Sequence, residues 1–261
     1  MTIDLEYVKQ VAVGAAYKGA EALMAGFEGE LSVTRKGAKD LVTDADTASE
    51  QAILDTLAYR FPDHAVLAEE SGQTTGETAR YQWIIDPLDG TTNFAHGLGL
   101  FSVSIAFAME GEVAVGVVLN PKTGELFTAV KDQPATLNGT PIHVSQTPDI
   151  GDALLVTGFP YDFQDHLDTL MDRFKTCLNA AQGVRRLGSA ALDLCYVASG
   201  RFDGYWEQNL HKWDTAAGML IARQAGAVVT DFSGEIYNPG DQEILATNGR
   251  LHNELIALVT I

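Results

Sequence analysis

The chain has 261 residues, 46% of them hydrophobic, which is enough to bury a large core as one domain or as two closely joined ones. Its 17 basic and 35 acidic residues give a net charge of −18, which argues against direct binding to nucleic acid and leaves a metal site as one use for some of the acids. No basic, apolar leader and no apolar run of membrane-spanning length is visible, so we expect a cytoplasmic enzyme that does not bind membranes.

Two amphipathic helices are predicted near the N-terminus. Residues 4–27 carry apolar side chains at helical spacing, with polar residues on the opposite side. The segment TASEQAILDTLAYRF opens with a capping box, formed by Thr47 and Glu50, and places its apolar residues on one stripe. This pattern predicts a second helix that ends near Pro62.

The next stretches are rich in strand-forming residues. A short run, AVLA, ends in the acid Glu69. Three longer β-rich runs, joined by short turns, predict an antiparallel meander over residues 101–109, 112–119 and 125–130. Asn138 and Gly139 mark another tight turn. We therefore expect residues 1–145 to form an α+β half with a largely antiparallel sheet.

After about residue 150 the pattern alternates between strands and helices. Predicted strands cover 153–159, 184–188, 203–207, 227–231 and 243–247, and predicted helices cover 164–180, 189–200, 213–226 and the residues from about 250. Cys177 and Cys195 lie in helical stretches without CxxC spacing, which favours reduced structural thiols over a disulfide. We expect an α/β half over residues 146–261, packed on the first half as one compact unit with the site between them.

One segment, WIIDPLDGTTNFAHG, places acids at the end of an apolar strand. Residues 82–86 predict a buried strand that stops at Pro87, because proline has no N–H for a sheet ladder. Gly90 permits a turn, so the chain can bend and bring the carboxylates of Asp86 and Asp89 together. Asp-Pro and Asp-Gly are also ordinary turn dipeptides, so a turn without any catalytic or metal-binding role would explain the same residues.

Two convergent carboxylates repel each other, which leaves two chemical outcomes. One carboxyl can stay protonated, as in pairs that share a proton, or a multivalent cation can neutralise both. Hard oxygen ligands favour Mg²⁺, and Mn²⁺ can substitute for it. Thr91 or Thr92 can cap the helix that follows, and with Gly90 they present backbone N–H groups that can bind phosphate. Together these features favour metal-assisted phosphoryl chemistry.

Three separated segments carry a resemblance to a known family. LAEES, DPLDGTTNF and WDTAAGMLIARQAGAV, in this order and spacing, resemble the inositol monophosphatase family of Mg²⁺-dependent, lithium-sensitive phosphomonoesterases. The likeness spans nearly the whole chain and includes KDLVTDAD at 39–46 and GSAALDLCYVASGRFDGYWE at 188–207. The resemblance implies an α/β (α+β layered) fold, an alternating α-β-α-β-α sandwich of the sugar phosphatase type, and a homodimer.

The resemblance also implies two or three Mg²⁺ ions per site and matches their ligands to this sequence. Glu69, Asp86 and the backbone carbonyl of Leu88 would hold the first ion. Asp86, Asp89 and Asp214 would hold the second. Taken alone, Asp214 is also explained as an N-cap acid at the start of its predicted helix.

Catalytic and substrate-binding positions follow from the same resemblance. Glu69 and Thr91 match the pair that orients the attacking water, and Asp46 matches an acid near the outer metal. The residues implied in substrate binding are Asp89, Gly90, Thr91, Arg185, Gly188, Ser189, Ala190, Glu207 and Asp214. Taken alone, Arg185 is equally explained as an exposed surface cation.

The sequence favours one substrate class and leaves alternatives open. Thr92 in DGTTNF resembles the inositol monophosphate branch, because branches that act on sulfated nucleotides commonly carry lysine there. We predict hydrolysis of myo-inositol monophosphate, a small phosphorylated polyol, by a metal-activated water. Fructose 1,6-bisphosphate and histidinol phosphate are alternative substrates. A different alternative is a transcription-antitermination protein that binds RNA polymerase and its factors and keeps the phosphatase fold, as some bacterial relatives do.

Overall fold

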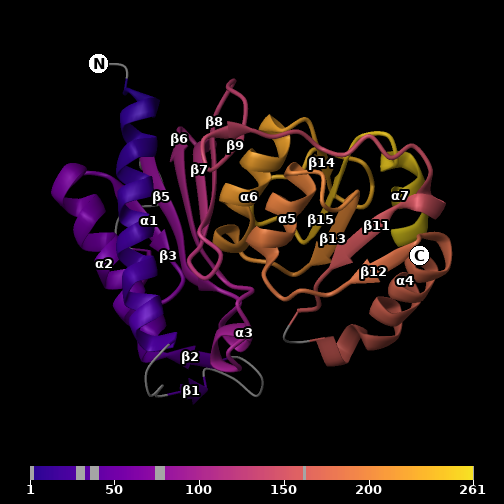
Figure 1. The fold of residues 1–261 in the computed structure, drawn as a ribbon, viewed down its shortest axis with the longest axis horizontal. Helices are drawn as coiled ribbons and strands as arrows, with labels where there is room; N and C mark the ends of the chain where they lie inside the picture. The colour runs from indigo at the N-terminus through magenta and orange to yellow at the C-terminus, as the bar shows by residue number, and fades with distance from the viewer. Residues whose placement is uncertain (1–2, 28–32, 36–40, 74–79, 161–162, 261) are drawn as a thin grey trace.

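The chain forms a stack of five alternating layers. The computed structural model describes residues 3–27, 33–35, 41–73, 80–160 and 163–260. Within them a pair of helices, an eight-stranded sheet, a second pair of helices, a five-stranded sheet and a last pair of helices follow one another (Figure 1). The expected α-β-α-β-α sandwich is confirmed. The first two residues of the KDLVTDAD segment lie outside the described part of the chain.

The first layer consists of α1 (Leu5–Phe27) and α2 (Asp44–Arg60). The start of α2 differs from the prediction, because the cap is Thr43 and the capping-box partner is Asp46. The hydroxyl of Thr43 accepts the N–H of Ala45 at 3.2 Å, and the carboxylate of Asp46 accepts the N–H of Thr43 at 2.8 Å. The predicted box at Thr47 is therefore wrong, since a threonine–acid pair one turn upstream already satisfies the free N–H groups.

The eight-stranded sheet has the order β10-β9-β8-β7-β6-β5-β3-β4, and only β3 and β5 run parallel within it. Its strands are β3 (Ala65–Ala68), β4 (Gly72–Gln73), β5 (Tyr81–Asp89), β6 (Ser102–Met109), β7 (Glu112–Asn120), β8 (Glu125–Val130), β9 (Thr136–Leu137) and β10 (Thr140–Pro141). The predicted meander is confirmed as β6, β7 and β8, and Asn138 and Gly139 form the tight turn before β10. A separate two-stranded sheet pairs β1 (Val33–Arg35) with β2 (Leu41–Thr43).

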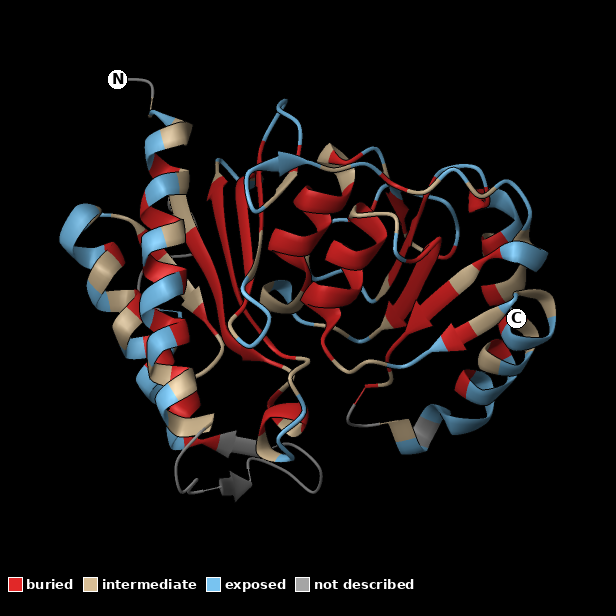
Figure 2. Cartoon of the chain, in the orientation of Figure 1, coloured by how far each residue is buried: buried red, intermediate tan, exposed pale blue. Residues whose placement is uncertain are grey.

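The middle layer consists of α5 (Ala190–Ala198) and α6 (Lys212–Gln224). All nine residues of α5 are buried (Figure 2). The two helices share one hydrophobic core with both sheets, for example with Phe127 on β8 and Ala246 on the second sheet. This common core explains why residues from both halves of the sequence can meet at one place.

The five-stranded sheet has the order β12-β11-β13-β15-β14. Its strands are β11 (Leu154–Thr157), β12 (Gly183–Arg185), β13 (Gly204–Gln208), β14 (Val228–Thr230) and β15 (Glu243–Thr247). β11 pairs in parallel with β12 and β13, whereas β15 is antiparallel to both of its neighbours. Two more helices, α4 (Leu167–Ala180) and α7 (His252–Val259), cover its outer face, and short 3-10 turns occur at Ile150–Asp152 and Phe163–His166.

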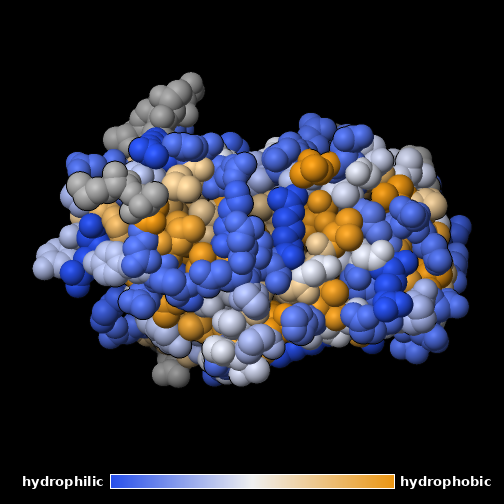
Figure 3. All heavy atoms as spheres, turned by 90° about the horizontal axis from the view of Figure 1, so that it is seen from above, coloured by the Kyte–Doolittle hydropathy of each residue, from blue (hydrophilic) through white to orange (hydrophobic). Residues whose placement is uncertain are grey.

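The surface and the cysteines agree with the composition. Among the residues that the structure describes, no helix is both long and apolar enough to cross a bilayer. Seen from above, hydrophobic side chains lie in groups separated by hydrophilic ones (Figure 3). Cys177 and Cys195 are buried and free, which confirms that they form no disulfide.

Candidate active site

A bulge in β5 places two acids on one face of the first sheet. Asp86 pairs with Ser104 of β6 and Asp89 pairs with Ser102, so three steps along β5 match two along β6. Because side chains alternate along a strand, Ser102 and Ser104 share a face, and the extra residue puts both aspartates on that face as well. The predicted end of the strand at Asp86 is therefore wrong: pairing resumes beyond Pro87.

Glu69 follows β3, the parallel neighbour of β5. Its N–H donates to the carbonyl of Ile85 at 3.1 Å, which places Glu69 level with the bulge. The buried carboxylate of Glu50 fixes the next turn, because it accepts the N–H groups of Glu70 and Ser71, both at 2.9 Å. Glu50 was read from the sequence as a helix cap, and only the tertiary contact shows that it supports the turn beside Glu69.

Asp214 approaches the same face from α6. It is the third residue of the helix rather than the predicted cap, and its Oδ2 accepts the N–H of His211 at 2.6 Å. The hydroxyl of Ser104 donates to the carbonyl of Trp213 at 3.3 Å. This bond ties the start of α6 to the face of the sheet that carries the two β5 aspartates.

Asp89 is also anchored to the start of α5. Its Oδ2 accepts the hydroxyl of Ser189 at 2.5 Å and the N–H of Ala191 at 2.8 Å. Ser189 is at the same time the N-cap of α5, where its hydroxyl oxygen accepts the N–H of Leu192 at 3.4 Å. One serine therefore joins the first sheet to the middle layer and satisfies a helix end.

Gly90 begins the short helix α3 (Thr91–Ala95). Its φ is 95°, in the left-handed region, and a Cβ there would lie 3.0 Å from the carbonyl oxygen of Leu100. Only glycine fits this position without moving backbone. No side chain caps α3, so the prediction that Thr91 or Thr92 caps it is wrong.

The hydroxyl of Thr91 joins Asp46 to the bulge. Its Oγ1 lies 3.1 Å from the carbonyl oxygen of Leu88 and 3.3 Å from Oδ1 of Asp46, and it can donate its single proton to either. The other oxygen of Asp46 accepts the N–H and the hydroxyl of Thr43 at 2.8 Å and 2.6 Å. All four residues are buried, so the orientation of Thr91 is set by the protein rather than by solvent.

Burial and repulsion both disfavour the charged form of the gathered acids. Burial raises the pKa of Asp86 well above its usual value, and the charges of Glu69, Asp89 and Asp214 raise it further. Burial raises the pKa of Asp89 to about 6, against hydrogen bonds that lower it. The pKa of Asp214, whose surface is partly exposed, is raised by removal from bulk water and then by the charge of Asp89. A nearby cation would relieve this repulsion.

These acids border a cleft of about 750 Å³ between the two halves of the chain. The sequence-predicted residues that line it are Glu69, Asp89, Gly90, Gly188, Ser189, Ala190, Glu207 and Asp214. Asp46, Asp86, Leu88 and Thr91 are buried next to these residues, through the contacts described above. Its lining residues come from six separate stretches of the sequence, between positions 69 and 242.

A model of the inositol monophosphatase family matches residues 4–260. The chain belongs to this family. The inositol-1-monophosphatase of Synechocystis is 45% identical over 253 residues, covering 97% of this chain and 88% of the relative. Nus factor SuhB of Escherichia coli is 41% identical over 249 residues, covering 95% and 93%. The crystal structure of extragenic suppressor protein suhB from Bartonella henselae matches with a TM-score of 0.93 and 38% identity, covering 97% of this chain and 98% of that chain.

The donor chemistry of this inositol monophosphatase family member fits a divalent cation. The family is generally metal-dependent. Carboxylate oxygens and the Leu88 carbonyl are hard ligands that suit Mg²⁺. Burial and the charges of neighbouring acids raise the pKa values of Asp86 and Asp214, and a cation would offset both effects. In the described parts of the chain, no group of three or more histidine, cysteine, aspartate or glutamate side chains is arranged so that it could hold a metal ion. Oδ1 of Asp86 and Oδ2 of Asp214 instead accept the backbone N–H groups of Leu88 and His211.

Arg185 is the one predicted substrate residue whose side chain lies apart from the cleft. It is exposed, and its Nη1 donates to the carbonyl of Val184 at 3.1 Å. The next residue, Arg186, lines the cleft instead. The sequence also gave no role to Asn93, whose amide donates to the carbonyls of Leu100 and Leu187 at 2.7 Å and 2.8 Å and so ties the DGTTNF loop to the segment before α5.

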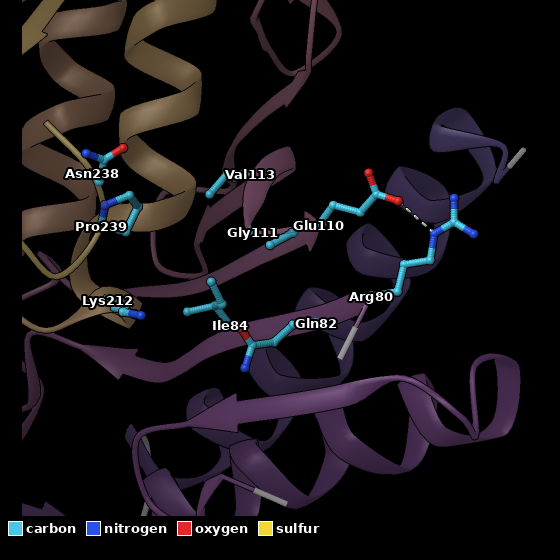
Figure 4. Close-up of a pocket in the computed structure, with 10 residues that line it drawn as sticks. Arg80, Gln82, Ile84, Glu110, Gly111, Val113, Lys212, Asn238 and Pro239 are labelled. Carbon is cyan, nitrogen blue, oxygen red and sulfur yellow. Dashed lines mark ion pairs between the residues drawn. The ribbon is translucent and has the colours of Figure 1, made fainter. Parts of the chain in front are cut away.

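A second pocket of about 660 Å³ lies over β5, β6 and β7 beside the start of α6 (Figure 4). Arg80 and Glu110 form an ion pair of 3.1 Å at one end of it, and Lys212 and Asn238 lie at the other. The two pockets have no lining residue in common. The gathered acids therefore belong to the first cleft alone.

Proposed function

We propose that the chain is a Mg²⁺-dependent phosphomonoesterase that hydrolyses myo-inositol monophosphate to myo-inositol and phosphate. The observation that supports this most strongly is the convergence of Glu69, Asp86, Asp89 and Asp214 from β3, β5 and α6. Repelling acids beside an open cleft are suited to holding cations, and a cation next to a cleft suits a phosphate ester. The 45% identical Synechocystis relative is named inositol-1-monophosphatase.

The proposed ligands divide into two overlapping sets. Glu69, Asp86 and the Leu88 carbonyl would hold one ion, and Asp86, Asp89 and Asp214 would hold another. When bound, Mg²⁺ supplies Lewis acidity, which makes water more nucleophilic near neutral pH and offsets negative charge on the departing ester oxygen. Mn²⁺ offers the same chemistry to the same oxygen ligands.

The residues around these ligands orient water and substrate. Thr91 donates its proton to Asp46 or to the Leu88 carbonyl, which leaves its oxygen able to accept a hydrogen bond from the attacking water. The backbone amides of Gly90 and Thr91 are proposed to donate to the phosphate oxygens. The alcohol is proposed to contact Gly188, Ser189, Ala190 and Glu207, which line the cleft, whereas Arg185 does not line it.

The direct test is phosphate release from myo-inositol 1-phosphate with and without Mg²⁺, compared with fructose 1,6-bisphosphate and histidinol phosphate. Release from the inositol ester that requires Mg²⁺ and is lost in Asp89→Asn supports both the reaction and the site. Activity on another ester alone would change the assigned substrate and would leave the proposed mechanism in place. Absence of activity on all three esters overturns the proposal.

A protein-binding role is the second candidate, because several relatives at 41–44% identity are named Nus factor SuhB. Capture of RNA polymerase from a lysate by both the wild-type chain and Asp89→Asn would support a role independent of catalysis, and failure of both would remove it. We also propose that the chain is a cytoplasmic homodimer. A monomer mass in light scattering contradicts the dimer.

A further inference from the structure

The second pocket lies beside the candidate active site, and the proposed reaction does not use it. Ile84 lines this pocket two positions before Asp86 on β5, so the two side chains share one face of the first sheet. One end of the pocket is lined by the first residue of α6 and by the segment before β15, namely Lys212, Asn238 and Pro239 (Figure 4). Its volume of about 660 Å³ falls within the range of roughly 300–1,000 Å³ that is typical of small-molecule sites.

The floor of the second pocket is apolar and is held in place by the core. Ile84 and Ala108 are buried members of the hydrophobic core that the first sheet shares with α5 and α6. Val113, on the neighbouring strand β7, is partly buried and packs against the same core. A ligand with an apolar body would remove this floor from water, which favours its binding.

One end of the pocket carries an acid whose charge is already compensated. Nε of Arg80 lies 3.1 Å from Oε1 of Glu110, and the N–H of Glu110 also donates to the carbonyl of Arg80 at 2.8 Å. Glu110 and Gly111 form the two-residue turn between β6 and β7 with φ of 54° and 88°, a geometry that asparagine and glycine favour over glutamate. The turn and the backbone bond therefore hold this carboxylate beside its counter-ion.

The other end carries a cation that has no counter-ion. The ammonium of Lys212 forms no ion pair and no hydrogen bond with the part of the chain that the structure describes. The methylene stem of Lys212 rests on Gly240, where a Cβ would lie 3.0 Å from its Cγ and its Cε. Gln82, a partly buried lining residue, has a side-chain amide that likewise lacks a partner among the described residues. An uncompensated cation and a free amide therefore border the apolar floor, in a chain whose net charge is −18.

We propose that the second pocket binds a small organic anion, whose carboxylate pairs with Lys212 and whose apolar body lies on Ile84 and Val113. The sign of the charge follows from the lining, because Lys212 is the one of its three charged residues without an oppositely charged partner. The apolar floor disfavours a polyol phosphate, whose hydroxyl groups would lose hydrogen bonds to water there. The bound anion would contact β5 and α6, the two elements that carry Asp86 and Asp214.

The first test locates the bound anion by NMR of the methyl-labelled, chelator-treated full chain. The probe is 3-phenylpropionate, and 3-phenylpropanol and 3-phenylpropylamine are matched compounds with the same body and a different charge. Without metal, the acids of the first cleft repel an anion, so the methyl signals of Ile84 and Val113 should shift and that of Ala190, which lines the cleft, should not. A shift of Ala190 without Ile84, equal binding of all three compounds, or no binding of the propionate overturns the proposal.

The second test measures the Kd of 3-phenylpropionate in variants of the exposed Lys212, whose replacement leaves the core intact. Lys212→Gln should raise Kd about fivefold, whereas Lys212→Arg keeps the charge and should stay within about twofold of the wild type. Lys175→Gln, which changes an exposed lysine on α4, is the matched control and should leave Kd unaltered. Inorganic phosphate, which lacks an apolar body, should bind more weakly. An unchanged Kd in Lys212→Gln overturns the pairing with the carboxylate, and equal affinity for phosphate overturns the role of the floor.

Discussion

The carboxyl of Glu207 should make the metal-free protein less stable as pH rises towards 7. Burial raises its pKa from the usual 4.5 to about 7, although the Tyr205 hydrogen bond and the charge of Arg186 oppose the change. Between these two values the folded chain still binds a proton that the unfolded chain has released, so the free energy of unfolding falls with increasing pH. The stabilisation is complete below about pH 4.5 and is lost as pH rises through about 7.

The size of the effect follows from this interval. Within the interval, the free energy of unfolding falls by about 1.4 kcal/mol for each pH unit. Glu207 therefore accounts for a loss of about 3 kcal/mol across the whole interval and of about 2 kcal/mol between pH 5.5 and 8. The narrower range is the practical one, because the isoelectric point of about 4.5 favours precipitation at lower pH. A change of this size is a large part of the 5–15 kcal/mol that stabilises a typical protein, on the order of a fifth.

Urea denaturation of chelator-treated protein at pH 5.5 and pH 8 measures this loss of stability. Glu207→Gln removes the titrating group, so the free energy of unfolding of the variant should rise by about 2 kcal/mol relative to that of the wild type between pH 5.5 and pH 8. Glu254→Gln, an exposed glutamate on α7, is the matched control and should follow the wild type. If the difference between wild type and Glu207→Gln is the same at both pH values, the Glu207 carboxyl is not protonated in the folded chain and the reasoning fails.

Three further predictions concern two supports of the site and one buried thiol. Glu50→Gln weakens two hydrogen bonds to the turn after Glu69, so the binding free energy of Mg²⁺ should weaken by about 1–3 kcal/mol. The Mg²⁺ concentration for half-maximal activity should rise accordingly, and an unchanged Mg²⁺ titration contradicts this. Ser189→Ala removes the cap of α5 and should cost about 1 kcal/mol in urea denaturation, whereas an unaltered midpoint would show that the cap is dispensable. Burial raises the pKa of the Cys177 thiol to about 12, so a thiol reagent at pH 8 should label it only after unfolding, and rapid labelling of the folded chain argues against this burial.

Periodicity and turn chemistry predicted the elements better than their ends. The meander, the long N-terminal helix and the turn at Asn138 follow from spacings of two and 3.6 residues and from Asn-Gly geometry, all of which are local. The end of β5 was wrong because a bulge depends on the partner strand: Pro87 lacks an N–H, yet pairing resumes at Asp89 through Ser102. A single strand, examined without its neighbour, does not show that register.

In the candidate site, the proposed ligands were predictable from the sequence and the residues that support them were not. The ligand set was predicted by resemblance to a family, and the acids at the ends of AVLA and of residues 82–86 were visible from the sequence alone. The supports were not visible, because Glu50 and Asn93 act through residues that are 20 and 94 positions away in the sequence.

The contacts around the acids indicate that the fold, rather than a bound cation, sets the geometry of the site. Asp86, Asp89 and Asp214 each accept a backbone N–H, from Leu88, Ala191 and His211. These donors belong to a bulge, to the start of α5 and to the start of α6. Ala191 and the neighbours of His211 pack in the apolar core between the two sheets, whereas Leu88 lies in the core that the first sheet shares with α1 and α2. Raised pKa values show that the arrangement opposes ionisation, so it is packing elsewhere that stabilises it. A cation that enters such a site gains affinity, because it offsets the repulsion between acids that the fold already holds as neighbours.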